Sequence, residues 1–190
     1  MRPLLVLLLA LSGCLAPHPD MVSVGLSVPI GNGLSDATLN DSHSSGSGEP
    51  VAVTRLYCGP AWEIGEGPYY LDLGILTTVT FVTGHESGGP GIGGEVALRP
   101  RYDFGTWEPY VKASAGFEIY TDRIGEQGTN WGFPLAAGVG ARFELKEGLW
   151  LTAEFTLWHE SNGAKVFGHG RYPNPGYNGD LLTVGAELEF

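Results

Sequence analysis

The chain has 190 residues, including 30 glycines and 13 prolines, and fits a single domain rich in strands and turns. Its formal net charge of −11, from 10 Lys and Arg against 21 Asp and Glu, argues against nucleic acid as a partner, which selects for clustered basic residues. Beyond the first segment there is no run of 18 apolar residues, which argues against a protein that crosses a membrane with helices.

The N-terminus has the composition of an export signal. A basic residue precedes the apolar run Leu4–Leu11, which small residues follow, so we expect residues 1–16 to be a secretory signal peptide. Two processing sites fit. The four residues ending at Cys14 resemble a lipobox, in which this cysteine becomes the lipidated first residue, whereas ordinary cleavage after Ala16 would place it at the −3 position. Both predict export of one domain over residues 20–190.

Apolar and polar residues then alternate with period two, the pattern of a half-buried strand. This alternation predicts strands at 22–28, about 51–62 and about 69–82. A Gly, Ser, Asn and Asp-rich stretch over 31–50 predicts a long loop between the first two strands, and Glu63–Gly67 predicts a short turn between the next two.

The glycine-rich stretch 88–94 formally matches the dinucleotide-binding pattern G-x-G-x-x-G over Gly89–Gly94. Such a site needs a helix whose N-terminus faces the pyrophosphate, but the strand pattern Glu95–Arg99 follows instead. We therefore reject a nucleotide site and predict a flexible loop before the fourth strand.

The alternation pattern predicts eight strands in all, and the connections between them alternate strictly between long and short. An even number of strands and such alternating connections are typical of outer-membrane barrels. The sequence therefore predicts an all-β fold, an eight-stranded antiparallel up-and-down transmembrane β-barrel of outer-membrane type. The other five strands are expected at about 94–102, 111–119, 133–145, 149–161 and 180–190.

One face of the strands is apolar and the other carries charges, which would face solvent in a soluble β-sandwich but pair inside the lumen of a membrane barrel. The export signal, the alternating connections and a last strand ending on Phe190 favour the membrane barrel. A terminal Phe of this kind resembles the signal read by the outer-membrane assembly machinery. The expected lumen charges are Arg55, Asp72, Arg99, Arg101, Lys112, Glu118, Arg142, Glu144, Glu154, Glu187 and Glu189.

Aromatic residues near strand ends suit the interfacial girdles of such a barrel, although each has ordinary packing as an equal alternative. The candidates are Tyr69, Tyr70, Trp107, Tyr110, Tyr120, Trp131, Trp150 and Trp158.

A histidine and a serine lie two residues apart at the end of the seventh strand. Side chains two apart on a strand share a face, so His159 and Ser161 would project together from the lipid-facing row, with the spacing of a Ser-His nucleophile pair. On the neighbouring last strand the same parity, read back from Leu182, gives Asp180 and Asn178. These four side chains are expected at the outer rim of the barrel, whereas Glu160 would face the lumen in a structural role.

The run His159-x-Ser161-Asn162, followed by Asn174-Pro175-Gly176-x-Asn178 before a last strand ending in Phe, resembles the PagL-type lipid A 3-O-deacylases, also called acyloxyacyl hydrolases. The motif match is sharp over residues 158–190. The resemblance implies an eight-stranded barrel that cleaves the ester-linked 3-acyl chain of lipid A without a metal or other cofactor. It makes Ser161 the nucleophile and His159 its base, with Asn162, Gly163 and Asn174 in the oxyanion-stabilising neighbourhood.

The sequence departs from this family at two places. Founding members carry a glutamate as the third member of the triad, where this chain has Asn178, with Asp180 one same-face step later. Either side chain could orient the histidine, and the motif spacing favours the asparagine. Gly163 directly follows Asn162, so the sequence does not define which groups donate to the oxyanion.

The function that follows is an outer-membrane serine esterase acting on lipid A or a related outer-leaflet lipid. Its expected partners are lipopolysaccharide and the outer membrane, and a homodimer is left open. The alternative is a non-catalytic barrel that acts in surface interaction through its long loops, such as 31–50. No metal site is expected, because the remaining histidines, at 18, 43, 85 and 169, lack ligand spacing.

Overall fold

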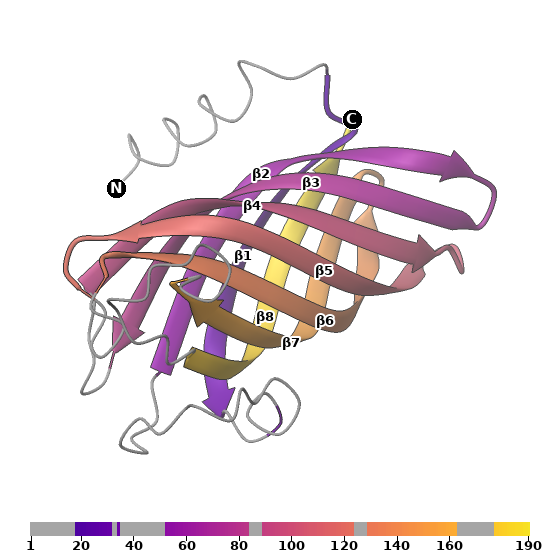
Figure 1. The fold of residues 1–190 in the computed structure, drawn as a ribbon. Coiled ribbons are helices and arrows are strands. Elements are labelled where there is room, and N and C mark those ends of the chain that lie inside the picture. The colour runs from indigo at the N-terminus through magenta and orange to yellow at the C-terminus, as the bar shows by residue number, and fades with distance from the viewer. Residues whose placement is uncertain (1–17, 32–33, 35–51, 84–88, 124–128, 163–176) are drawn as a thin grey trace.

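The computed structural model describes residues 18–31, 34, 52–83, 89–123, 129–162 and 177–190 (Figure 1). Eight antiparallel strands pair in chain order, and pairing of the first with the last closes the barrel. This confirms the eight-stranded up-and-down barrel expected from the sequence. The strands are β1 (Met21–Gly31), β2 (Ala52–Glu66), β3 (Tyr69–Thr83), β4 (Gly89–Tyr102), β5 (Trp107–Tyr120), β6 (Trp131–Lys146), β7 (Leu149–Ser161) and β8 (Tyr177–Glu189).

The two ends of the barrel differ in how the strands are joined (Figure 1). At the end where β1 begins and β8 ends, here called the turn end, short turns link β2 to β3, β4 to β5 and β6 to β7. Gly67, Gly105 and Gly148 lie in these turns with φ of +77°, +92° and +73°, the left-handed region that glycine adopts without steric cost. The longer connections leave the opposite end, here called the loop end, which is where β7 ends. Within the described residues, no helix is long and apolar enough to cross a membrane.

Two predicted loop segments are strand in the structure. β2 continues to Glu66 and pairs with β3 through the predicted turn, which shrinks to Gly67 and Pro68. The predicted flexible loop at Gly89–Gly94 is the first part of β4, paired residue by residue with β3. A Cβ atom at Gly93 would lie 2.2 Å from the carbonyl oxygen of Phe117, so these glycines allow close approach of backbones. Pairing with neighbours on both sides outweighs the low intrinsic strand propensity of glycine.

The lumen is filled by the charged side chains of the inward rows, as expected. Arg55, Arg99, Arg101 and Arg142 are buried there and form ion pairs with buried carboxylates. Glu95 and Glu108 also take part, pairing with Arg55 and Arg101, although the sequence analysis did not include them. The prediction that Glu144 faces the lumen is wrong, because this residue lies exposed beside the turn end.

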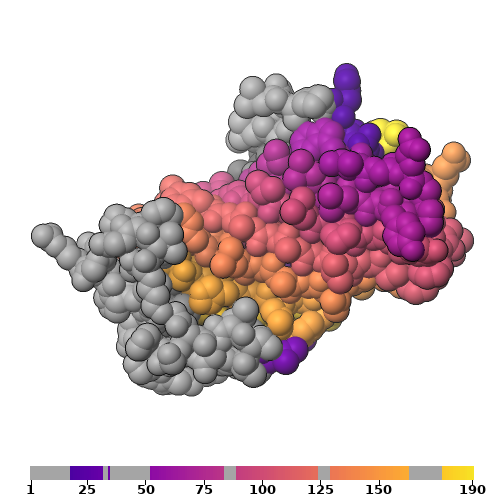
Figure 2. All heavy atoms as spheres, turned by 45° about the vertical axis from the view of Figure 1, so that its right-hand side comes forward, coloured from indigo at the N-terminus to yellow at the C-terminus, as the bar shows by residue number. Residues whose placement is uncertain are grey.

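The outer wall is apolar around the whole circumference, and in Figure 2 neighbouring strands contribute adjacent bands of its surface. An exposed apolar belt around a barrel whose interior is charged is the reverse of a soluble sandwich, and it matches a wall that faces lipid. Each strand supplies at least one exposed aliphatic side chain, among them Val24, Leu56, Ile75, Val96, Val111, Val139, Leu151 and Val184.

Several aromatic residues expected in the interfacial girdles face the lumen instead. They share the parity of the charged rows, and some stack on lumen cations: the guanidinium of Arg142 lies 4.1 Å from the ring centroid of Trp150. Tyr69 and Trp107 remain exposed on the outside. The inward-facing aromatics, for which the girdle assignment is wrong, are Tyr70, Tyr110, Tyr120, Trp150 and Trp158.

Candidate active site

The strand β7 presents His159 and Ser161 on the outside of the barrel at the loop end. Its even positions, from Thr152 to Glu160, are all buried in the lumen, whereas its odd positions are partly or fully exposed. His159 and Ser161 are half-buried and belong to the odd row. They therefore continue the lipid-facing row of Leu157 at the end of the wall.

The imidazole of His159 is held by Asn178. The two residues are register partners on β7 and β8, and His159 Nδ1 lies 2.7 Å from Asn178 Oδ1. An amide oxygen can only accept, so in this arrangement Nδ1–H donates the hydrogen bond. The lone pair of the neutral imidazole is then on Nε2, which is the atom that can take a proton from a nucleophile.

Asp180 lies one same-face step along β8 and has another role. Its Oδ2 accepts a hydrogen bond of 2.9 Å from the backbone N–H of Leu34, and its register partner on β7 is Leu157. Asp180 is 8% exposed, although Leu182 on the same outward row is 43% exposed. The structure thus brings Asn178, and not Asp180, to the imidazole.

Ser161 is the last residue of β7 and pairs with Phe133 of β6. Within the described residues its hydroxyl makes no hydrogen bond to His159, and nucleophile-base contacts are often long before substrate binds. Asn162, which follows, is buried. Gly163 and Asn174 lie outside the described residues, so their part in stabilising an oxyanion stays a prediction.

Glu160 lies between His159 and Ser161 in the chain and points the opposite way, into the lumen, as expected. It is 1% exposed, and the Tyr120 hydroxyl lies 2.5 Å from its Oε2 and 2.7 Å from Oε2 of Glu118. The hydroxyl therefore bridges β7 to β5 across the lumen. Arg55 donates to Glu118 over 3.0 Å and extends this polar layer to β2. The end of β7 is thereby fixed from beneath.

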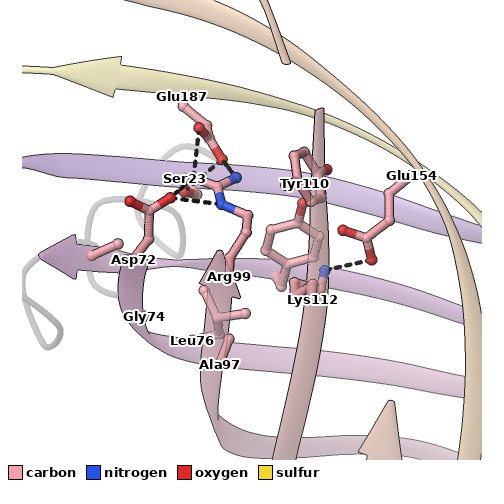
Figure 3. Close-up of a pocket in the computed structure, with 12 residues that line it drawn as sticks. Ser23, Asp72, Gly74, Leu76, Ala97, Arg99, Tyr110, Lys112, Glu154 and Glu187 are labelled. Carbon is pink, nitrogen blue, oxygen red and sulfur yellow. Dashed lines mark hydrogen bonds and ion pairs between the residues drawn. The ribbon is translucent and has the colours of Figure 1, made fainter. Parts of the chain in front are cut away.

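A second candidate site is a cavity in the lumen of the barrel (Figure 3). It has a volume of about 30 Å³, which suffices for ordered water but is far below the roughly 300–1,000 Å³ of ligand sites. Its charged lining groups pair with one another: Lys112 with Glu154 at 2.6 Å and Arg99 with Asp72 at 2.8 Å. Among the described residues there is also no group of three His, Cys, Asp or Glu placed to hold a metal ion. The outward site is therefore the stronger candidate.

The β6 neighbours of the site belong to no motif in the sequence. Phe133 is the register partner of Ser161, and Leu135 is that of His159. Both belong to the apolar row of β6, so parity identifies their face, but strand register alone brings them beside Ser161 and His159.

Comparison with known proteins agrees with this architecture. The model of the family described as lipid A 3-O-deacylase (PagL) matches residues 32–187. The crystal structure of the outer membrane enzyme PagL aligns with a TM-score of 0.57 and 15% identity over 88% of this chain and 99% of that one. A de novo designed transmembrane β-barrel (TM-score 0.42, 18% identity, 92% and 98% coverage) and Neisserial surface protein A (0.45, 10%, 90% and 96%) are also similar. No curated protein sequence matches the chain. Because the family model covers more than half of the chain, this protein belongs to the lipid A 3-O-deacylase (PagL) family and is an integral outer-membrane β-barrel.

Proposed function

We propose that the protein is a serine esterase that removes the 3-O-linked acyl chain of lipid A. Family membership supports the reaction class. The observation that carries the site is the 2.7 Å contact between His159 Nδ1 and Asn178 Oδ1, on the outward row that also holds Ser161.

In the proposed reaction, Ser161 Oγ attacks the ester carbonyl carbon while its proton passes to His159 Nε2. The tetrahedral intermediate then collapses: the bond to the sugar oxygen breaks, that oxygen takes the proton from the imidazolium, and the acyl group stays on the serine. Water attacks the acyl-enzyme with the same histidine as base, releasing the fatty acid and restoring the hydroxyl.

Asn178 acts through the histidine in this mechanism. Its amide oxygen accepts the Nδ1–H hydrogen bond, which fixes the tautomer and the ring orientation. A neutral acceptor stabilises the imidazolium less than a carboxylate would, so we expect a working but slower enzyme than one with an acid at this position. Donors to the oxyanion would come from the neighbourhood of Asn162, Gly163 and Asn174.

The position of the site suits a substrate that resides in the membrane. Lipid A diffuses laterally, and its esters lie near headgroup depth, where a pair at the rim of the lipid-facing wall can reach them. The alternative, surface interaction through the loop 31–50, rests mostly on residues outside the described ones, and family membership favours the enzyme.

The test uses the purified barrel in detergent with lipopolysaccharide as substrate and mass spectrometry of the lipid A product. We expect the wild type to release the 3-linked acyl chain. Ser161→Ala and His159→Ala should abolish this release while unfolding at the same temperature as the wild type. Phe143→Ala, a substitution on the outer face of β6 at the turn end, is the control for an outward substitution away from the site. Release that persists in Ser161→Ala would show that the site assignment is wrong, and a wild type that releases no acyl chain would overturn the function.

A further inference from the structure

Glu160 lies between the histidine and the serine of the candidate site in the chain, but its side chain is buried on the opposite face of β7, in the lumen. Burial of an ionised carboxylate is unfavourable, so a buried carboxyl group either pairs with a cation or takes up a proton. The bridge that Glu160 forms with Tyr120 and Glu118 shows which of the two states it adopts.

The Tyr120 hydroxyl lies between two carboxyl groups. Its oxygen is 2.5 Å from Oε2 of Glu160 and 2.7 Å from Oε2 of Glu118, and both distances are those of full hydrogen bonds between a hydroxyl and a carboxylate. A tyrosine hydroxyl has one proton, so it can donate one of these bonds and must accept the other. One of the two glutamates therefore carries a proton and donates it to the tyrosine oxygen.

Glu118 has the surroundings of an ionised carboxylate. Its Oε1 accepts hydrogen bonds from the hydroxyls of Thr78 and Thr80, over 2.7 Å and 2.8 Å, and from the Arg55 guanidinium over 3.0 Å. A cation and several donors favour the charged form of a carboxyl group. The shared proton of the bridge consequently belongs to Glu160.

The charges on the surrounding strands agree with this assignment. Arg55 on β2 forms ion pairs with two carboxylates, Glu118 on β5 and Glu95 on β4. On β8 the register partner of Glu160 is Tyr177, a residue that is neutral at ordinary pH. With Glu160 ionised as well, Arg55 would face three negative groups in a layer closed off from solvent. A neutral Glu160 avoids this excess of negative charge.

From this proton count we infer that Glu160 is held as a neutral carboxylic acid, and that its hydrogen bond to Tyr120 positions the two catalytic side chains beside it on β7. The inference rests on the proposed function and adds two positioning residues, both of which lie in the lumen, away from the substrate. On its other side Glu160 packs against Gly132 of β6, where a Cβ atom would lie 2.0 Å from its Oε1. The carboxyl group is thus held between β5 and β6, and the backbone on either side of it carries His159 and Ser161.

Loss of this proton should slow the enzyme. With Glu160 ionised, two negative carboxylates would face the single proton of the tyrosine hydroxyl, and their repulsion would open the bridge. The end of β7 would then be free to move. A misplacement of catalytic groups by about 1 Å can lower a rate by up to about a hundredfold.

The first test detects the proton in the purified barrel. The infrared C=O stretching band of protonated carboxylic acids is recorded at about pH 7, where ordinary glutamates, with a pKa of about 4.3, are ionised. We expect Glu160→Gln to have a weaker band than the wild type. Glu154→Gln is the matched control and should keep the full band, because Glu154 lies on the same inward row of β7 and pairs with Lys112 at 2.6 Å. A band of equal intensity in the wild type and Glu160→Gln overturns the inference.

The second test measures kcat for acyl release from lipopolysaccharide. Glu160→Gln, whose neutral amide can also donate to Tyr120, should keep the wild-type kcat at about pH 7 within about threefold. Glu160→Ala, which removes the bridge, should lower kcat by about tenfold or more. As the pH rises, the wild-type kcat should fall together with the infrared band, and Glu160→Gln should lack this fall.

Three results of the second test contradict the positioning role. Equal losses in Glu160→Gln and Glu160→Ala would show that the negative charge is needed. A lower unfolding temperature of Glu160→Ala at unchanged kcat would show a structural role alone. A band that disappears at high pH while the wild-type kcat stays constant would separate the proton from catalysis.

Failure of this inference is distinguishable from failure of the proposed function. If acyl release depends on Ser161 but is equal in the wild type, Glu160→Gln and Glu160→Ala, the esterase stands and the positioning role is wrong. If the infrared band depends on Glu160 but the wild type releases no acyl chain, the neutral glutamate stands and the proposed function is wrong.

Discussion

Replacement of Asn178 by alanine removes the hydrogen-bond acceptor 2.7 Å from His159 Nδ1 and leaves the nucleophile and base in place. During attack the imidazole becomes positively charged, so the bond that is lost is one to a charged group, which contributes about 1.5–3 kcal/mol. At about 1.4 kcal/mol per factor of ten, kcat should fall by about 10-fold to 150-fold. Asn178→Glu, which supplies a charged acceptor, should instead keep or raise kcat.

The assay is release of the 3-linked acyl chain from lipopolysaccharide under saturating substrate, with thermal unfolding measured in parallel. Asp180→Asn is the matched control, because it lies on the same face of β8 and its amide oxygen can still accept the hydrogen bond from Leu34 N–H. It should change kcat by less than about threefold, within the scatter of one neutral hydrogen bond. Equal losses in Asn178→Ala and Asp180→Asn, or full activity in Asn178→Ala, would refute the reasoning about the imidazole.

Two further predictions concern the layers that hold the wall in place. Gly132→Ala would put a Cβ atom 2.0 Å from Oε1 of Glu160, the buried side chain that fixes the end of β7, so it should cost about 1–3 kcal/mol of unfolding free energy in urea. Gly74→Ala, where the nearest atom is 3.6 Å away, should cost far less, and equal costs would contradict the role of Glu160 in fixing β7. Arg142→Met removes the guanidinium 2.6 Å from the buried carboxylate of Glu108, which keeps Arg101 as its second partner. It should therefore destabilise the barrel by about 1–3 kcal/mol, an effect that an unchanged urea midpoint would disprove.

The faces of the strands could be predicted from the sequence because side-chain direction is a local property of an extended chain. Period-two alternation on β7 places His159 and Ser161 outward and Glu160 inward without reference to any other strand. The same rule assigns Trp158 to the lumen, where the structure buries it, so parity is a better guide to its place than its closeness to a strand end.

The extent of the strands was predictable only in part. Gly89–Gly94 and Glu63–Glu66 have the composition of loops, and they become strand because a neighbouring strand is available to pair with them. Whether such a segment becomes strand depends on backbone hydrogen bonds to a segment distant in sequence, and these cannot be predicted from local composition.

Sequence alone thus determined a closed barrel with charges inside, an apolar outside and a His-x-Ser pair at its loop end. It left open whether an amide or a carboxylate meets the histidine, since Asn178 and Asp180 have the same parity. Tertiary structure decided it through register: β8 begins at Tyr177, so that Asn178 lies opposite His159 and Asp180 opposite Leu157. A shift of two residues would preserve every face and bring Asp180 opposite His159 in place of Asn178, and the observed pairing of β7 with β8 excludes that shift.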